Sequence, residues 1–159
     1  MKRFLFSTTF TSPFADWGLL ALRAGIGLMM AFAHGYGKFN RVLSGDMQFG
    51  DPLGLGPGLT LILAVLAEFF CSFLIVFGLL TRVAVVPLII TMLTAVFIVH
   101  ADDPFARQEL GLLYLFPYIL LLLTGPGRFS LDAIIGRKML APLKSPEAAV
   151  SSAQSPTRL

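Results

Sequence analysis

The first long apolar run of the chain, residues 17–39, carries three ionisable side chains, those of Arg23, His34 and Lys38. On an α-helix, eleven steps of 100° bring His34 to within about 20° of Arg23, and Lys38 follows about 40° further round. The three side chains therefore share one face of the predicted helix. A charge that faces lipid costs roughly 2.5–3.5 kcal/mol, so this face is expected to contact protein or water, where its groups can donate hydrogen bonds or move protons.

The second apolar run, residues 58–80, contains a single charged residue, Glu68, near its middle. Small and polar residues recur around Glu68 at three- and four-residue spacing, which is typical of a helix face that packs closely against another helix. This stripe consists of Thr60, Ala64, Ala67, Cys71 and Ser72. The pattern predicts that Glu68 points into a helix bundle and away from lipid.

Counting residues along each apolar run estimates the depth of these groups. At 1.5 Å per residue, His34 and His100 both lie about 25 Å from the end of the bundle that carries the termini, and Glu109 lies close to the same level. Glu68 lies about 18 Å from that end and Arg23 about 9 Å. This convergence predicts a polar pocket that opens on the outer side, away from the termini. We also expect the long Arg23 side chain to reach Glu68 and form an ion pair with it.

The composition indicates the kind of protein that must position these residues. Of the 159 residues, 56% are hydrophobic and only 13% are charged, a balance typical of a small polytopic membrane protein. A helix of about 23 residues spans roughly 35 Å, which is enough to cross a bilayer. Four apolar runs occur, at about residues 17–39, 58–80, 83–100 and 109–124. The sequence therefore predicts an all-α membrane protein, a four-transmembrane-helix bundle over residues 17–127.

The two ends of the chain differ from the apolar runs. Residues 1–16 mix Phe with Lys, Arg, Ser and Thr and lack the clean apolar region of a signal peptide, which predicts a retained segment at the membrane interface. Residues 128–140 predict a second interfacial segment, an amphipathic helix with Ser130 as its N-cap. Residues 141–159 are rich in Pro, Ser and Ala without periodicity, which predicts a disordered tail.

Basic residues are distributed unevenly between the predicted loops. With four spans both termini share one side, and eight Lys and Arg residues fall on that side against three on the other. The positive-inside rule then places both termini in the cytoplasm. The basic residues flank apolar runs and do not cluster with interleaved aromatic residues, so no nucleic-acid partner is expected; the expected partner is the lipid bilayer.

Several sequence motifs occur together across these runs. They are LLALRAGIGLMMAFAHGYGKF in the first run, LAEFFCSFLIVFGLLTRVAVVPLIITMLTAVFIVH across the second and third, and ELGLLYLFPYILLLLTGPGRFSLDAII at the end. Together they cover nearly all of residues 17–135 and resemble the DoxX family of small four-helix bacterial membrane proteins. One departure is the pair Cys71-Ser72, where the family usually has two glycines. Both residues are small, so close helix packing is expected to persist.

The resemblance implies respiratory or sulfur redox chemistry in the bacterial cytoplasmic membrane, since related proteins are subunits of thiosulfate:quinone oxidoreductase. On this hypothesis the protein is a quinone-linked oxidoreductase or the membrane subunit of one, with a redox subunit or a second copy of the chain as partner. The expected proton-transferring catalytic residues are His34, Glu68, His100 and Glu109, and the expected quinone-binding residues are Arg23, Lys38 and Tyr114. No metal site is expected. The single cysteine excludes a CxxC pair, so redox chemistry would need a bound cofactor.

Two alternatives stay open on the sequence alone. His34 and His100 could ligate a haem b from two helices, although the angular offset of His100 disfavours this. The protein could also be a non-enzymatic scaffold or a permeation protein for small solutes, in which Arg23 and Glu68 only fix the helix register.

Overall fold

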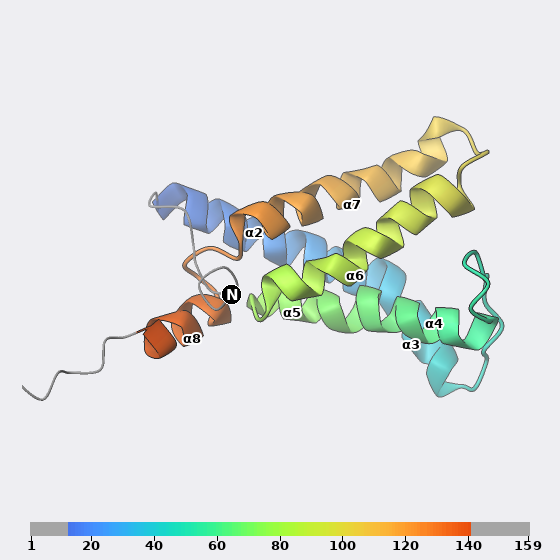
Figure 1. Ribbon diagram of the computed structural model, residues 1–159, viewed down its shortest axis with the longest axis horizontal. Helices are drawn as coiled ribbons and strands as arrows, with labels where there is room; N and C mark the ends of the chain where they lie inside the picture. Colours follow the sequence, from blue (N-terminus) through green and yellow to red (C-terminus); the bar gives the residue numbers. More distant parts are fainter. Residues whose placement is uncertain (1–12, 141–159) are drawn as a thin grey trace, which may run out of the picture.

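The computed structural model describes residues 13–140. Over these residues every regular element is a helix (Figure 1), which confirms the predicted all-α fold. The α-helices are α2 (Pro13–Met29), α3 (Tyr36–Leu43), α4 (Pro57–Val65), α5 (Ser72–Phe77), α6 (Thr81–Thr94), α7 (Phe105–Thr124) and α8 (Leu131–Leu140), and the π-helical turns are η1 (Met30–Gly35), η2 (Leu66–Cys71) and η3 (Ala95–Val99). The tail predicted over residues 141–159 and most of the interfacial segment predicted over residues 1–16 lie outside the described residues.

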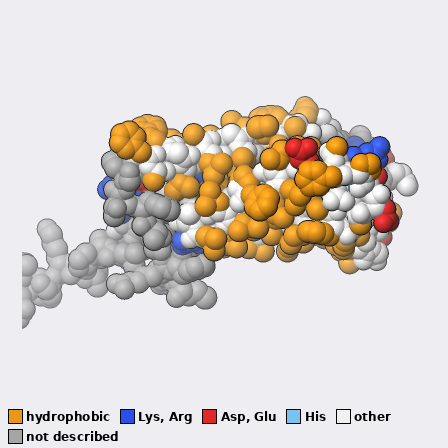
Figure 2. Space-filling view, turned by 90° about the horizontal axis from the view of Figure 1, so that it is seen from above, with side chains coloured by type: hydrophobic (Ala, Val, Ile, Leu, Met, Phe, Trp, Pro, Cys, Tyr) orange, Lys and Arg blue, Asp and Glu red, His pale blue; other side chains and the backbone are white. Residues whose placement is uncertain are grey.

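Consecutive elements join into four helices that are long and apolar enough to cross a membrane. They are span 1 (Phe14–Leu43), span 2 (Pro57–Phe77), span 3 (Thr81–Val99) and span 4 (Phe105–Thr124). Hydrophobic side chains are spread over the middle of the face seen in Figure 2, as expected for a surface against lipid tails. The predicted four-helix membrane fold is confirmed, and the cytoplasmic location of the termini stays a prediction.

The four spans form two antiparallel pairs. Span 1 packs along span 2, with α2 against α5, η1 against η2 and α3 against α4, and span 3 packs along span 4 through α6 and α7. The pairs meet near α8, where α5 and η2 contact α6 and α2 contacts α7. Toward the loops at residues 44–56 and 100–104 the pairs diverge (Figure 1), and within the described part of the chain α3 and α4 have no substantial packing against spans 3 and 4. The bundle is therefore V-shaped, with a closed end near α8 and an open end at these loops.

Two glycines let span 1 cross span 2 at short range. A Cβ atom added at Gly27 would lie 2.9 Å from the carbonyl oxygen of Ser72, and one added at Gly35 would lie 2.8 Å from that of Glu68. Both distances are too short for a methyl group, so a larger residue would push the helices apart. The contact at Ser72 confirms close helix packing at this residue of the pair Cys71-Ser72.

The turn between spans 2 and 3 is fixed by a side chain in the first turn of the last helix, α8. Gly78 and Leu80 form the turn with positive φ angles of 66° and 48°. Thr81 and Arg82 directly follow the turn and begin α6. The Asp132 carboxylate accepts hydrogen bonds from the amides of Leu80 (2.7 Å) and Thr81 (2.9 Å), and so satisfies two donors that the start of α6 leaves open.

Arg23 is fully buried at the closed end and does not reach Glu68. Its guanidinium donates to the carbonyl oxygens of Ile75 (3.2 Å), Val76 (3.3 Å) and Phe129. The first two belong to the last turn of α5, whose carbonyls have no partner within the helix. The predicted ion pair between Arg23 and Glu68 is wrong, and Arg23 instead joins the end of α5 to the segment before α8.

The segment before α8 also contacts the start of span 1. The Ser130 hydroxyl accepts a hydrogen bond from the amide of Ala133 at 3.1 Å, which confirms the predicted N-cap. The buried carboxylate of Asp16, in the first turn of α2, accepts from the amide of Arg128 at 2.8 Å. The closed end is thus tied together by polar contacts, while the interfacial position of α8 stays a prediction.

Candidate functional site

A cavity of about 680 Å³ lies between the two helix pairs at the open end of the bundle. Five of the seven predicted site residues line it, namely His34, Lys38, Glu68, His100 and Tyr114. The two others lie elsewhere: Arg23 is at the closed end, and Glu109 is exposed and is not part of the lining. The cavity thus brings together groups from spans 1, 2 and 4 and from the end of span 3.

Each of the three π-helical turns lies beside the cavity. His34 lies in η1, Glu68 lies in η2, and His100 directly follows η3. A π-helical turn contains one more residue than an α-helical turn, which changes the direction of the side chains that follow, and such turns recur at functional sites. These turns could not be predicted from the sequence, because the additional residue has no characteristic type.

The Lys38 ammonium forms an ion pair with the Glu68 carboxylate where spans 1 and 2 cross. Lys38 also donates to the carbonyl oxygen of His34, 3.3 Å away. Only 6% of the Glu68 side chain is exposed, against 22% for Lys38. Among the described residues Glu68 is the one acidic residue that lines the cavity, and its burial in apolar surroundings is offset by Lys38.

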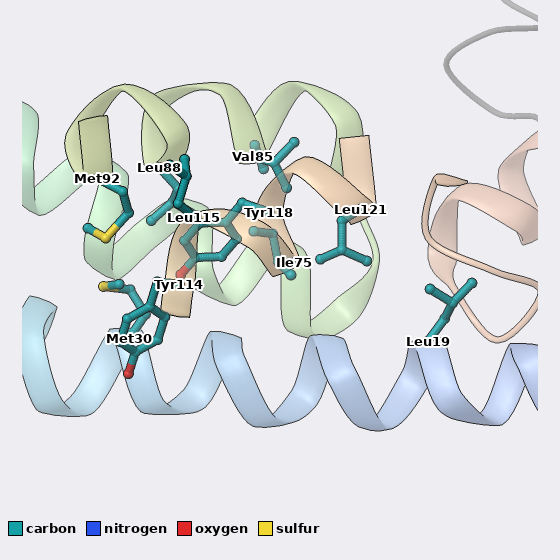
Figure 3. Close-up of a cluster of buried hydrophobic side chains, with 11 residues drawn as sticks. Leu19, Met30, Ile75, Val85, Leu88, Met92, Tyr114, Leu115, Tyr118 and Leu121 are labelled. Atoms are coloured by element: carbon teal, nitrogen blue, oxygen red, sulfur yellow. The ribbon is translucent and has the colours of Figure 1, made fainter. Parts of the chain in front are cut away.

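The rings of His34 and Tyr114 meet edge to face, with centroids 5.5 Å apart and planes at 85°. This contact joins span 1 to span 4 across the cavity. Tyr114 in turn stacks on Tyr118 at 6.2 Å, and Figure 3 shows both rings in the core between α2 and α7 with Met30 beside Tyr114. The Tyr118 hydroxyl is buried and has no hydrogen-bond partner among the described residues. The two tyrosines therefore mark the boundary between the cavity and the apolar core of the closed end.

A polar cluster fixes the rim of the cavity after span 3. Nδ1 of His100 lies 2.7 Å from one carboxylate oxygen of Asp103, and Arg107 donates to the other at 3.2 Å. The hydrogen bond with His100 lowers the pKa of Asp103, and Arg107 lowers it further, against a smaller opposing effect of desolvation. Gln108 donates to the carbonyl oxygen of His100 at 2.8 Å. These contacts position His100 and Arg107, which both line the cavity.

Several lining residues were not predicted from the sequence. Thr91 and Thr94 of span 3 line the cavity together with Arg107 from the first turn of α7. The two threonines lie three residues apart on one helix face, and this spacing is the signal that could have identified them. No group of three or more His, Cys, Asp or Glu side chains in the described part of the chain is arranged to hold a metal ion.

Comparison with known proteins places this bundle in a family. The model of the family described as DoxX matches residues 18–101, slightly more than half of the chain. The chain belongs to the DoxX family. The matched region of this DoxX protein contains four of the five predicted site residues that line the cavity, namely His34, Lys38, Glu68 and His100, and it ends before the fifth, Tyr114.

Two curated relatives cover most of this DoxX protein. It is 33% identical over 130 residues to Inner membrane protein YqjF of Escherichia coli (strain K12), a match that covers 77% of this chain and 95% of that protein. It is also 33% identical over 119 residues to Putative oxidoreductase CatD of Bacillus subtilis (strain 168), covering 74% of this chain and 87% of that protein. No solved structure matches the chain. The family and the four spans together show a multi-pass membrane protein.

Proposed function

We propose that the cavity binds the headgroup of a quinone, and that the protein is a quinone-linked oxidoreductase or the membrane subunit of one. The observation that carries this proposal is the position of the Lys38–Glu68 ion pair, His34 and Tyr114 in one largely apolar cavity within membrane-spanning helices. A relative whose name describes it as an oxidoreductase supports redox chemistry for this chain as well.

The residues present fit such a ligand in size and in chemistry. The volume of about 680 Å³ lies within the range of roughly 300–1,000 Å³ typical of small-molecule sites. The two carbonyl oxygens of a quinone accept hydrogen bonds, and Lys38, His34 and Tyr114 all carry N–H or O–H donors. Its flat ring suits the apolar walls, to which Met30 and Met92 contribute.

A bound quinone supplies the redox chemistry by accepting two electrons and two protons. The protein residues bind it and move the protons. The Tyr114 hydroxyl and the His34 imidazole hold the headgroup, and His34 is also a proton donor suited to neutral pH. Glu68 returns protons to His34, and Lys38 compensates the carboxylate charge while it does so. Arg23 and Glu109 lie outside the cavity, so the proposal gives them no part in binding.

The electrons come from outside this chain. The sequence contains one cysteine and no pair that could cycle between thiol and disulfide. The proposed electron donor is therefore a second substrate, such as a small sulfur oxyanion, or a partner subunit that carries its own redox group.

The shape of the cavity favours a binding site over a permeation route. Between Tyr114 and the closed end, buried apolar residues fill the space between the helices, and Figure 3 shows this core. Its most buried members are Ile75, Val85, Leu88, Tyr118 and Leu121. A path for polar solutes across the membrane would have to pass through this packed region, so the cavity ends within the bilayer.

Equilibrium binding of decylubiquinone to the protein in proteoliposomes tests the proposal. We expect saturable binding to the wild type, weakened about tenfold or more in Tyr114→Phe and in His34→Ala, because each loses a hydrogen bond to the ligand. Phe116→Leu is the matched control, since Phe116 is exposed on the same helix and does not line the cavity. An absence of saturable decylubiquinone binding to the wild type would contradict the proposal.

A further inference from the structure

The cavity reaches the lipid-facing surface of the bundle between spans 2 and 3. Three residues that line it are also about half exposed, with exposed fractions of 45% for Leu63, 48% for Leu66 and 54% for Ile90. A side chain that lines a cavity and is also exposed on the outer surface marks the edge of an opening. Because these residues lie on two different spans, the opening is located between them.

The opening lies deep in the bilayer. Leu66 is nine residues from the start of span 2 at Pro57, and Ile90 is nine residues from the end of span 3 at Val99. Pro57 and Val99 both lie at the open end of the bundle. At 1.5 Å per residue, Leu66 and Ile90 therefore each lie about 14 Å from the open end, measured along the helix. The hydrocarbon core is about 30 Å thick, so these two residues lie close to its middle. The opening therefore faces lipid tails.

Small side chains keep the gap between the two spans open. The walls that face the cavity there include Ala64 and Ala67 from span 2 and Thr91, Thr94 and Ala95 from span 3. All five of these side chains are small. The gap widens from η2 toward α4, since η2 contacts α6, whereas α4 packs against α3 and η2 but not substantially against α6 within the described chain.

A loop lies over the aqueous end of the cavity. Phe49, Leu53 and Leu55 of the loop between α3 and α4 line the cavity at the open end. Asp51 holds this loop against span 2, since its carboxylate accepts from the amide of Gly56 at 2.8 Å and from the hydroxyl of Thr60 at 2.9 Å. The loop thus narrows the aqueous route with apolar side chains, of which Leu53 and Leu55 are each 48% exposed.

We propose that the gap between spans 2 and 3 is a lateral portal through which the cavity takes an amphipathic ligand dissolved in the bilayer. The polar head lies at the Lys38–Glu68 ion pair, and the apolar tail extends between Leu66 and Ile90 into lipid. This ordering follows from the polarity of the walls, which are charged at the ion pair and apolar at the edge. The identity of the head as a quinone rests on the proposed function, whereas the portal and the need for an apolar tail rest on the cavity alone.

The single cysteine of the chain provides a reporter inside the cavity. Cys71 lines the cavity and is partly exposed. In proteoliposomes, a maleimide with a hexadecyl chain reaches Cys71 from the bilayer, whereas a sulfonated maleimide has access only from water. We expect the hexadecyl reagent to label the wild type about tenfold faster or more. Labelling of denatured protein by each reagent gives the intrinsic rate with which that reagent reacts with Cys71.

Variants that narrow the portal from span 2 or from span 3 test whether the reagent enters between these spans. Ala64→Phe and Thr91→Phe, each verified to be folded by its unfolding midpoint, are expected to slow hexadecyl labelling about fivefold or more. Leu93→Phe is the control, because Leu93 lies on span 3 without lining the cavity. Equal rates for the two reagents, or unchanged hexadecyl labelling in both narrowed variants, would overturn the portal. The assay contains no quinone, so its failure and a failure of quinone binding are separate results.

Discussion

The Lys38 ammonium and the Glu68 carboxylate, thirty residues apart in the sequence, form an ion pair where the first two spans cross. The crossing is close because Gly35 leaves room for the backbone of Glu68. The same pair lies at the polar part of the cavity, beside the Tyr114 and His34 rings that join span 1 to span 4. One contact therefore contributes both to helix packing and to the chemistry of the site.

Removing Lys38 is expected to destabilise the bundle. Breaking a buried ion pair from one side costs about 3–5 kcal/mol, and since Lys38 is 22% exposed we expect about 1–3 kcal/mol for Lys38→Met after allowing for solvent screening. The free energy of unfolding, measured by denaturant titration in mild detergent, checks this value. The double variant Lys38→Met/Glu68→Leu is the control and should recover much of the loss. Strictly additive losses in the two single variants and the double variant would show that the pair is not coupled.

Gly35 and Gly37 offer a matched comparison on one helix. A Cβ at Gly35 would meet the backbone of Glu68 at 2.8 Å, whereas nothing lies within 4 Å of a Cβ at Gly37. Gly35→Ala should therefore destabilise the bundle by about 1–3 kcal/mol through overpacking. Gly37→Ala should stabilise it slightly, by about 0.5–1 kcal/mol, because alanine favours the helix. Equal effects of the two substitutions on the unfolding midpoint would contradict the close crossing.

Asp132 is expected to stabilise the closed end. Asp132→Ala leaves the amides of Leu80 and Thr81 without their acceptor, at a cost of about 2–4 kcal/mol if each bond contributes about 1–2 kcal/mol. Asp132→Asn keeps one acceptor oxygen and should lose less. Asp102→Ala, at an exposed position in the loop after span 3, serves as the control in the same unfolding measurement. A loss no larger than that of the control would argue against the cap.

The loop after span 3 should respond to acid through Asp103. The hydrogen bond with His100 and the charge of Arg107 lower the pKa of Asp103 in the folded protein. The stabilisation that the ionised Asp103 contributes is therefore complete at pH values above the pKa of about 3.9 that it has in the unfolded chain. This contribution is lost as the pH falls through the lower, folded pKa. A carboxyl carbon NMR titration should give a midpoint for Asp103 below about 3.9, and His100→Gln should raise it. A wild-type midpoint at or above the unfolded value would contradict the geometry.

Much of the candidate site could be predicted from the sequence because charges in apolar runs are rare. His34, Lys38 and Glu68 were recognised in this way, and all three line the cavity. Residue counting also placed His100 near the level of His34. These inferences need only helix periodicity and the cost of a charge in lipid, which both act locally along the chain.

The ion-pair partner of Glu68 could not be predicted by the same means. Arg23 shares a helix face with His34, yet its guanidinium binds carbonyl oxygens of Ile75 and Val76 at the end of α5. The carbonyl oxygens at a helix end lack partners within the helix and can therefore accept hydrogen bonds from a guanidinium, and no side-chain pattern reveals them. Glu109 was placed at the correct end of span 4, but its side chain is exposed, because depth along a helix does not fix the direction around it.

The quinone content of protein purified in mild detergent tests the central claim most directly. The wild type and His34→Ala would be extracted with organic solvent and their quinone measured by chromatography, with Phe116→Leu as the control. We expect about one quinone per wild-type or control chain, as for a specific site, and far less in His34→Ala. Wild-type protein without quinone, or equal quinone in His34→Ala, would contradict a quinone site at His34 in this cavity.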